Sequence, residues 1–162
     1  INLYGISKYS GELLCEYYNR NYGTNIKILR LSQVIGDDKN GYLISTYTEN
    51  AASGKPLAVY GESVGKRDYI YVKDACRAIW LSLQKYALCG AYNIGSGVGT
   101  TNAELAKAII RGFDSPSKIE TYRDKKEDTT VCYLDTSKAK SELGFECKYS
   151  LTEAFADIKK QR

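Results

Sequence analysis

Apolar and polar positions along the chain follow two spacings, which predict helices and strands in turn. Residues 4–22 carry pairs of leucines and tyrosines at helical spacing, so we expect a helix there that ends at Gly23. Residues 26–31 read Ile-Lys-Ile-Leu-Arg-Leu, a pattern typical of a strand. The same criteria predict further strands at 57–60, 69–72, 91–94 and 118–122, and further helices at 42–53, 74–86 and 101–110. Strands that alternate with helices indicate an α/β architecture.

Polar residues mark where these elements begin and end. Two capping boxes, Thr101–Glu104 and Ser150–Glu153, predict helix starts, and Asp135 is expected to cap a short helix that ends at Gly144. We expect loops, rich in Gly, Asn or charged residues, at 36–41, 61–67 and 123–128. The chain contains no Met and enters its first helix with no strand or cap before it. We therefore expect it to be the C-terminal piece of a longer protein.

Composition narrows the classes of protein that the chain can belong to. Its 162 residues are 43% hydrophobic and 26% charged, which is typical of a globular domain and excludes a disordered tail or a fibre. No stretch approaches the ~20 apolar residues of a membrane span. The 23 Lys and Arg are interspersed with 19 Asp and Glu. This balance suits a small anionic ligand, and we expect neither a nucleic acid nor a membrane as a partner.

Cysteine and histidine usage limits the chemistry further. The five cysteines include no C-x-x-C pair, and the chain has no His, so we expect no metal site. We interpret the cysteines as reduced, mostly buried thiols of a cytoplasmic protein. Without His, Ser-His-Asp and Cys-His catalysis is excluded. Any acid–base chemistry must therefore use Tyr, Lys, Asp or Glu.

Tyr4 and Lys8 form a candidate proton-transfer pair. Their spacing of four residues places both side chains on one helix face, with Cβ atoms ~5–6 Å apart. An ammonium beside a phenol favours the phenolate, which can then act as a base. In a chain with 15 Tyr such a pair also arises by chance, so the alternative is an exposed pair without a function.

Five segments extend this pair into an ordered set of motifs. They read YGISKYSGE at 4–12, LRLSQVIG at 29–36, RDYIYVKD at 67–74, YNIG at 92–95 and DTSKAKSELGF at 135–145. Together they closely resemble the NAD-dependent epimerase/dehydratase family, the extended short-chain dehydrogenase/reductases that act on nucleotide sugars. The resemblance covers essentially the whole chain.

The resemblance implies roles for residues near the cofactor. Tyr4 matches the catalytic Tyr that removes a proton from a sugar hydroxyl while hydride leaves for NAD. Lys8 matches the Lys that binds the nicotinamide ribose and stabilises the phenolate. Ser32 falls where a strand end meets the nicotinamide. Gln33 falls where the family usually has an Asn that touches the sugar nucleotide, so its longer arm changes that contact.

The resemblance also implies a set of substrate-binding residues. Arg67 matches an Arg that grips the diphosphate, and its alternative reading is a solvated loop charge. Ala58 and Tyr60 match the strand that lies along the nucleoside, although Tyr60 is equally compatible with the core. Lys125 takes the place of a second phosphate-binding Arg, with Arg123 as a nearby substitute.

Part of the family pattern is absent from this chain. The G-x-x-G-x-x-G loop, its acidic ribose ligand and the catalytic Ser/Thr precede the Tyr-Lys motif in the family. The glycines at 95–99 have the wrong spacing for a dinucleotide loop, and the resemblance implies that they fall in the substrate domain. We therefore expect the C-terminal part of a Rossmann-type doubly wound sheet at 1–36, and mainly a small α/β substrate-binding subdomain at 37–162. Residues 68–95 partly return to the sheet.

The function implied by the resemblance is that of a UDP-sugar 4-epimerase, in which NAD oxidises and then re-reduces a sugar hydroxyl. The alternatives are a nucleotide-sugar 4,6-dehydratase or reductase, or a non-catalytic module that binds a nucleotide sugar. We expect the intact enzyme to be a homodimer, and the isolated piece to be inactive.

Overall fold

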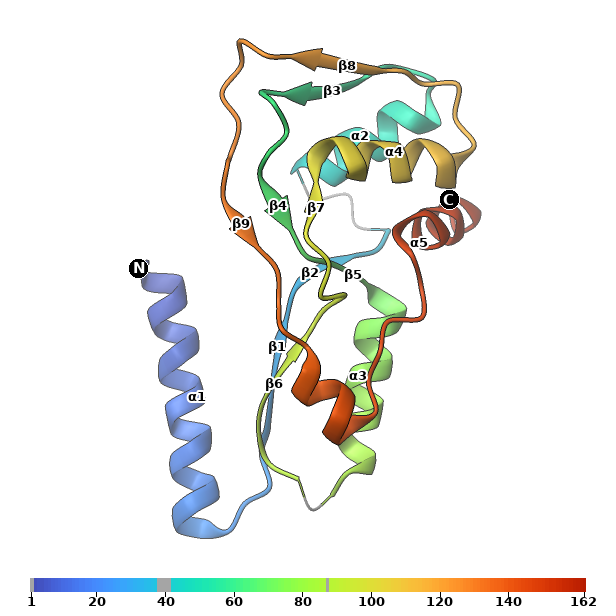
Figure 1. The fold of residues 1–162 in the computed structure, drawn as a ribbon. Coiled ribbons are helices and arrows are strands. Elements are labelled where there is room, and N and C mark those ends of the chain that lie inside the picture. The colour runs from blue at the N-terminus through green and yellow to red at the C-terminus, as the bar shows by residue number, and fades with distance from the viewer. Residues whose placement is uncertain (1, 38–41, 87) are drawn as a thin grey trace.

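The computed structural model describes residues 2–37, 42–86 and 88–162, and Figure 1 shows their arrangement. The helices are α1 (Leu3–Tyr22), α2 (Tyr42–Ala52), α3 (Val72–Gln84), α4 (Asn102–Phe113), the short η1 (Ala139–Leu143) and α5 (Leu151–Lys160). The strands are β1 (Lys27–Leu31), β2 (Gln33–Ile35), β3 (Leu57–Tyr60), β4 (Lys66–Arg67), β5 (Tyr69–Tyr71), β6 (Gly90–Ile94), β7 (Thr100–Thr101), β8 (Ile119–Tyr122) and β9 (Val131–Cys132). None of the helices among these residues is long and apolar enough to cross a bilayer.

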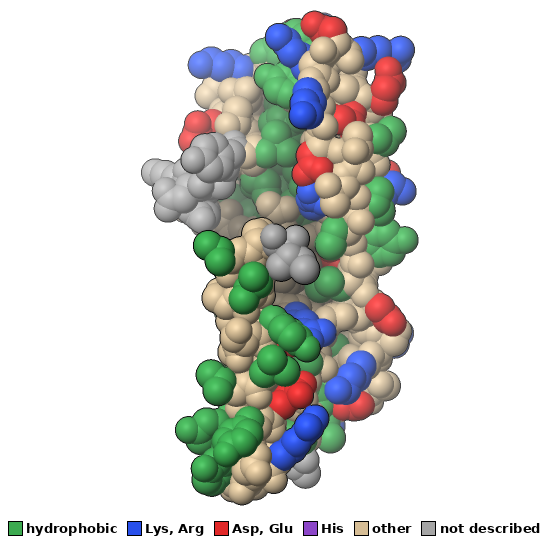
Figure 2. All heavy atoms as spheres, turned by 90° about the vertical axis from the view of Figure 1, so that its left-hand side faces the viewer, with side chains coloured by type: hydrophobic (Ala, Val, Ile, Leu, Met, Phe, Trp, Pro, Cys, Tyr) green, Lys and Arg blue, Asp and Glu red, His purple; other side chains and the backbone are tan. Residues whose placement is uncertain are grey.

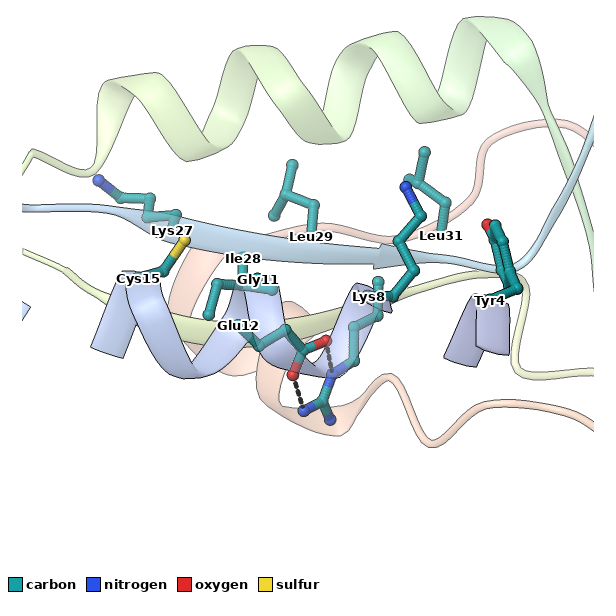
Figure 3. A pocket seen from close by; sticks show the side chains of 10 residues that line it. Tyr4, Lys8, Gly11, Glu12, Cys15, Lys27, Ile28, Leu29 and Leu31 are labelled. Atoms are coloured by element: carbon teal, nitrogen blue, oxygen red, sulfur yellow. Dashed lines mark hydrogen bonds and ion pairs between the residues drawn. The ribbon is translucent and has the colours of Figure 1, made fainter. Parts of the chain in front are cut away.

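A parallel pairing of strands organises the half of the molecule that carries both α1 and α3. β1 pairs in parallel with β6, and β2, which follows after Ser32, pairs in parallel with β5. The extended segment 27–35 therefore changes its partner at Ser32. α1 and α3 lie on opposite sides of β1 (Figure 3). Parallel strands joined through helices confirm the predicted α/β class.

The other half contains two smaller sheets. β3 pairs in parallel with β8, and β4 lies between β7, which is antiparallel to it, and β9, which is parallel to it. Two loops, 61–65 and 123–130, lead from the β3–β8 sheet to β4 and β9 respectively. Because both ends of these loops are paired, the loops run side by side (Figure 1).

Two apolar cores stabilise these halves. One core joins α2, α4 and α5 to β3 and β5, and includes Leu57, Leu105 and Phe155. The other joins α3, β6 and η1, and includes Tyr92 and Phe145. α1 contributes no buried residue to either core. A buried carboxylate, Asp74, accepts hydrogen bonds from the amides of Lys148 and Tyr149 and so ties the chain before α5 to α3.

Most predicted elements are confirmed, and the differences are local. Both capping boxes form, and Asp135 accepts a hydrogen bond from the Ser137 amide (2.9 Å) before the turns that end at Gly144. The prediction that no cap precedes α1 is wrong, because the Asn2 side chain accepts a hydrogen bond from the Gly5 amide. The expected loop 61–67 contains β4. Residues 38–41 of the expected loop 36–41 lie outside the described residues.

The prediction of mostly buried cysteines is wrong. Cys76, Cys89 and Cys132 are exposed, while Cys15 and Cys147 are partly buried, and all five are free thiols. Cys76 lies on the outer face of α3, and Cys132 lies in a two-residue strand at the margin of its sheet. Only Cys147 packs against a core, and burial raises the pKa of its thiol to about 12.

The close packing of α4 on α5 leads to a stability prediction. A Cβ at Gly112 would lie 2.6 Å from the Phe155 Cβ and 2.7 Å from the Thr152 carbonyl oxygen. We expect Gly112→Ala to lower the free energy of unfolding by about 1–3 kcal/mol, since the helices must move apart. Gly11→Ala is the control, because open space surrounds that position in α1, and it should raise stability by up to ~1 kcal/mol. Urea unfolding measures both, and an unchanged midpoint for Gly112→Ala would contradict the packing.

Candidate functional site

Tyr4 and Lys8 lie one turn apart near the start of α1. The Asn2 cap fixes the beginning of this helix. The Lys8 Nζ lies 5.5 Å from the centre of the Tyr4 ring. Both side chains point to the same side of the helix, beside the carboxyl end of β1 (Figure 3). Tyr4 is 71% exposed, so its hydroxyl is open to a ligand.

An ion pair holds the helix that carries these residues against β1. The Arg30 guanidinium donates two hydrogen bonds to the Glu12 carboxylate, at 2.8 and 2.5 Å. The Arg30 hydrogen bond holds the pKa of Glu12 below its ordinary value. A pocket of about 520 Å³ runs between α1 and β1, and both residues of the pair line it together with Tyr4 and Lys8 (Figure 3). This bidentate ion pair therefore sets the distance between β1 and the face of α1 that carries Tyr4 and Lys8.

Ser32 lies where the extended segment 27–35 changes its strand partner. Its amide donates to the Ile94 carbonyl (2.8 Å), and the next amide, that of Gln33, donates to the Asp68 carbonyl (3.0 Å). The Ser32 Oγ is buried and has no hydrogen-bond partner among the described residues. The Gln33 side chain is exposed. Ligands of open α/β sheets bind beyond the carboxyl ends of strands at such switch points.

The glycine-rich loop 95–99 binds a carboxylate of its own chain. Asp68 is 4% exposed and accepts hydrogen bonds from the Ser96 amide (2.8 Å), the Ser96 hydroxyl (2.7 Å) and the Gly97 amide (3.0 Å). The Leu134 amide donates to the same carboxylate at 3.2 Å. A Cβ at Gly95 would lie 2.6 Å from the Asp68 Oδ2, so only glycine allows this approach. The loop is therefore a structural brace in this chain.

Arg67 is fastened to the loop 123–130. Its guanidinium pairs with the Asp128 carboxylate and donates to the Thr130 carbonyl oxygen (3.1 Å). The alternative of a solvated loop charge is wrong, because Arg67 lies in β4 and its side chain is partly buried. The Thr130 hydrogen bonds and Arg67 together hold the pKa of Asp128 below its ordinary value.

The remaining candidates lie at the β3–β8 end. The rings of Tyr60 and Tyr122 meet edge to face with centres 6.0 Å apart, and both are exposed, so Tyr60 is not part of the core. The Ala58 carbonyl accepts a hydrogen bond from the Tyr47 hydroxyl (2.7 Å), whose pKa burial raises to about 12. The Lys125 side chain is exposed, and its amide donates to the Tyr122 carbonyl (3.2 Å).

The candidates thus form two groups. Tyr4 and Lys8 share the pocket between α1 and β1, while Arg67, Tyr60 and Lys125 surround the loops 61–65 and 123–130. The pocket that Tyr4 and Lys8 line is not lined by any member of the second group. The link between them is the backbone bond from Gln33 to Asp68, the residue after Arg67.

Comparison with known proteins gives this arrangement a family. The sequence model of the NAD dependent epimerase/dehydratase family matches residues 1–95. The chain belongs to the NAD dependent epimerase/dehydratase family. The resemblance carried by the five motifs is therefore confirmed, together with its Rossmann-type fold.

Relatives in this epimerase/dehydratase family include two kinds of enzyme. A dTDP-glucose 4,6-dehydratase from Streptomyces niveus is 33% identical over 95% of this chain and 45% of its own length. A UDP-N-acetylglucosamine 4-epimerase from Bacillus cereus superposes with a TM-score of 0.84 at 32% identity, covering 98% of this chain and 53% of the epimerase. A UDP-glucose 4-epimerase from Thermotoga maritima, solved with UDP-glucose, superposes with a TM-score of 0.78 at 34% identity, covering 99% and 54%. The chain spans about half the length of these relatives.

Sequence reasoning missed the groups that hold the site together. Asp68 stands in a quoted motif, but its role as the brace of the glycine loop depends on residues 28 positions away. Glu127 carries no local sequence signal, because the amides that bind its carboxylate lie 62–64 residues away. No cluster of three or more potential metal ligands occurs among the described residues.

Proposed function

We propose that this chain is the C-terminal part of a nucleotide-sugar epimerase, and that the intact enzyme acts as a UDP-sugar 4-epimerase. The observation that carries the proposal is the exposed Tyr4–Lys8 pair beside the carboxyl end of β1, next to the strand switch at Ser32. The two epimerase structures that superpose on the chain support this proposal.

The family name implies NAD as cofactor, and residues of this chain fit its nicotinamide end. The buried Ser32 Oγ, which follows the carboxyl end of β1, lacks a hydrogen-bond partner in the described structure. The Lys8 ammonium lies 5.5 Å from the centre of the Tyr4 ring, on the same side of β1 (Figure 3). A hydroxyl and an ammonium are suitable groups for the amide and ribose hydroxyls of a nicotinamide riboside. When bound, NAD would accept hydride from the sugar and return it.

Tyr4 carries the proton in the proposed mechanism. As a phenolate, its oxygen accepts the proton of a sugar hydroxyl while hydride leaves the same carbon, which gives a keto sugar. The Lys8 ammonium stabilises the phenolate by charge. When hydride returns to the other face of the keto sugar, Tyr4 gives its proton back, so each turnover restores the enzyme.

The second group of residues would bind the nucleotide. The guanidinium of Arg67 has N–H donors beyond those that bind Asp128 and Thr130, and these would bind phosphate oxygens, while the Lys125 ammonium offers a second positive charge. Tyr60 and Tyr122 present an exposed aromatic pair that suits a nucleoside. In this proposal Ala58 contributes through the strand backbone, and Gln33 reaches the sugar.

The mechanism predicts the effect of removing one oxygen atom. Tyr4→Phe in the full-length protein should lower kcat by about a hundred- to ten-thousandfold, because general base catalysis typically contributes ~10²–10⁴-fold. Bound NAD, measured by its absorbance after denaturation, should be retained. Tyr9→Phe is the control, since Tyr9 is also exposed on α1. Turnover retained by Tyr4→Phe would refute the assigned role.

A nucleotide-sugar 4,6-dehydratase is the second candidate, because the Streptomyces niveus relative is a dTDP-glucose 4,6-dehydratase. A reductase and a non-catalytic binding module are further alternatives. Calorimetric titration of the chain with UDP, dTDP and NAD distinguishes these classes. We expect UDP to bind and NAD to bind feebly or not at all, since about half of the family fold lies outside this chain. Preferential binding of dTDP would favour the dehydratase, and binding of neither nucleotide would contradict the whole proposal.

We also propose that the intact enzyme is a homodimer. α1 exposes a stripe of apolar side chains on the face opposite β1: Ile6, Tyr9, Leu13 and Tyr17. Figure 2 shows apolar side chains gathered over the part of this surface where α1 lies. A contiguous exposed apolar patch on a helix is typical of a helix-to-helix interface between subunits.

Light scattering of the full-length protein tests the dimer. The unmodified protein should have the mass of two chains, and Leu13→Glu should give a monomer, because it places a charge within the apolar stripe. Leu83→Glu is the matched control, since Leu83 is an exposed leucine on α3 and its replacement should leave the dimer intact. A monomeric unmodified protein would contradict the proposal.

A further inference from the structure

Three consecutive backbone amides converge on the carboxylate of Glu127. Its Oε2 accepts a hydrogen bond from the Ser63 amide at 2.5 Å. Its Oε1 accepts from the Val64 amide at 2.8 Å and from the Gly65 amide at 3.2 Å. Burial acts to raise the pKa of Glu127, but these amides together hold it below its ordinary value. The carboxylate is therefore bound in its charged form.

The loop 61–65 is shaped to receive this carboxylate. Gly61 has a φ of +67°, and a Cβ there would lie 2.1 Å from the Glu127 Oε2, so any side chain would displace the carboxylate. Ser63 also adopts a left-handed φ of +56°, which turns the successive amides toward one point. Its hydroxyl accepts a hydrogen bond from the Ala103 amide (2.9 Å), which anchors the loop to the start of α4.

The contact joins the two loops that carry the proposed phosphate-binding cations. The loop 61–65 leads directly into β4 and Arg67, and Lys125 lies two residues before Glu127. Asp128, the residue after Glu127, pairs with Arg67 itself. Two adjacent residues thus hold this region together. The Glu127 carboxylate binds the backbone of the loop 61–65, and the Asp128 carboxylate binds Arg67, which follows that loop.

We propose that Glu127 is a positioning residue, which fixes the separation of Arg67 and Lys125 so that the two cations bind the diphosphate of a nucleotide sugar together. The inference rests on the proposed function. The amides of the loop occupy both oxygens of Glu127, so the carboxylate acts through the backbone and does not touch the substrate. Its effect is therefore specific to ligands that carry the diphosphate.

Two variants of Glu127 in the full-length protein test this role. Glu127→Gln keeps the length of the side chain but turns one acceptor oxygen into a donor, which cannot accept from an amide. Glu127→Asp keeps the charge but is too short to reach the three amides. Both should weaken the binding of UDP by about tenfold, measured by calorimetry, while the affinity for uridine stays unchanged. The ratio of the two affinities separates diphosphate positioning from a general loss of structure.

Two further variants provide the controls. Glu62→Gln removes an equal charge from the same loop, where Glu62 makes only a loose, exposed ion pair with Arg123 at 3.7 Å, and it should bind UDP as the unmodified protein does. Arg67→Ala is the positive control, because it removes a proposed phosphate ligand. It should weaken UDP binding without changing the affinity for uridine.

Each outcome decides one of the two proposals. If Arg67→Ala weakens UDP binding and both Glu127 variants do not, the role of Glu127 is refuted and the proposed function stands. If the Glu127 variants weaken UDP and uridine equally, Glu127 is only structural and the inference is again refuted. If the unmodified protein binds neither UDP nor dTDP, the proposed function fails first.

Discussion

The geometry of the proposed site depends on the hydrogen bonds of one buried residue, Asp68. The backbone carbonyl of Asp68 accepts a hydrogen bond from the Gln33 amide at the strand switch. The Asp68 carboxylate accepts hydrogen bonds from the loop after β6 and from the Leu134 amide. Each hydrogen bond to a charged acceptor contributes about 1.5–3 kcal/mol, so four of them can offset the cost of burying the charge. One residue thereby connects the parallel strands to the three-stranded sheet that contains Arg67.

Around this connection, the two groups of candidate residues are held by different means. The Tyr-Lys face depends on a single helix, which a forked ion pair and an N-terminal cap fix in place without any buried side chain. The group around Arg67 depends on strands and loops that the carboxylates of Asp68, Glu127 and Asp128 hold together. Tyr4 is consequently more exposed to solvent than Arg67 is.

Local signals in the sequence were sufficient for the helices. The capping boxes at Thr101 and Ser150 formed as predicted because both partners of each box lie within one turn. The family motifs also placed Tyr4 and Lys8 on one helix face, since that requires only helical geometry. Asn2 was missed although its signal is equally local, because a cap at the second residue leaves little sequence before it to mark a boundary.

The interactions that the sequence did not reveal are long-range. β4 and β9 have two residues each, too short for an alternating pattern, and they exist because they pair with one another across the fold. The contacts of Asp68 and Glu127 likewise join segments tens of residues apart. The cysteines were misjudged because the tendency of a residue type to be buried does not say which face of a helix it occupies.

The order of strands along the chain has a consequence for how the protein is made. β1 leaves the ribosome before its partner β6, which follows only after α2, α3 and four further strands. The ion pair of Arg67 similarly cannot form until Asp128, 61 residues later, has been made. Pairings at such separations close slowly because loop-closure entropy opposes them. During translation the backbone groups of β1 therefore lack their partner strand until β6 has been made.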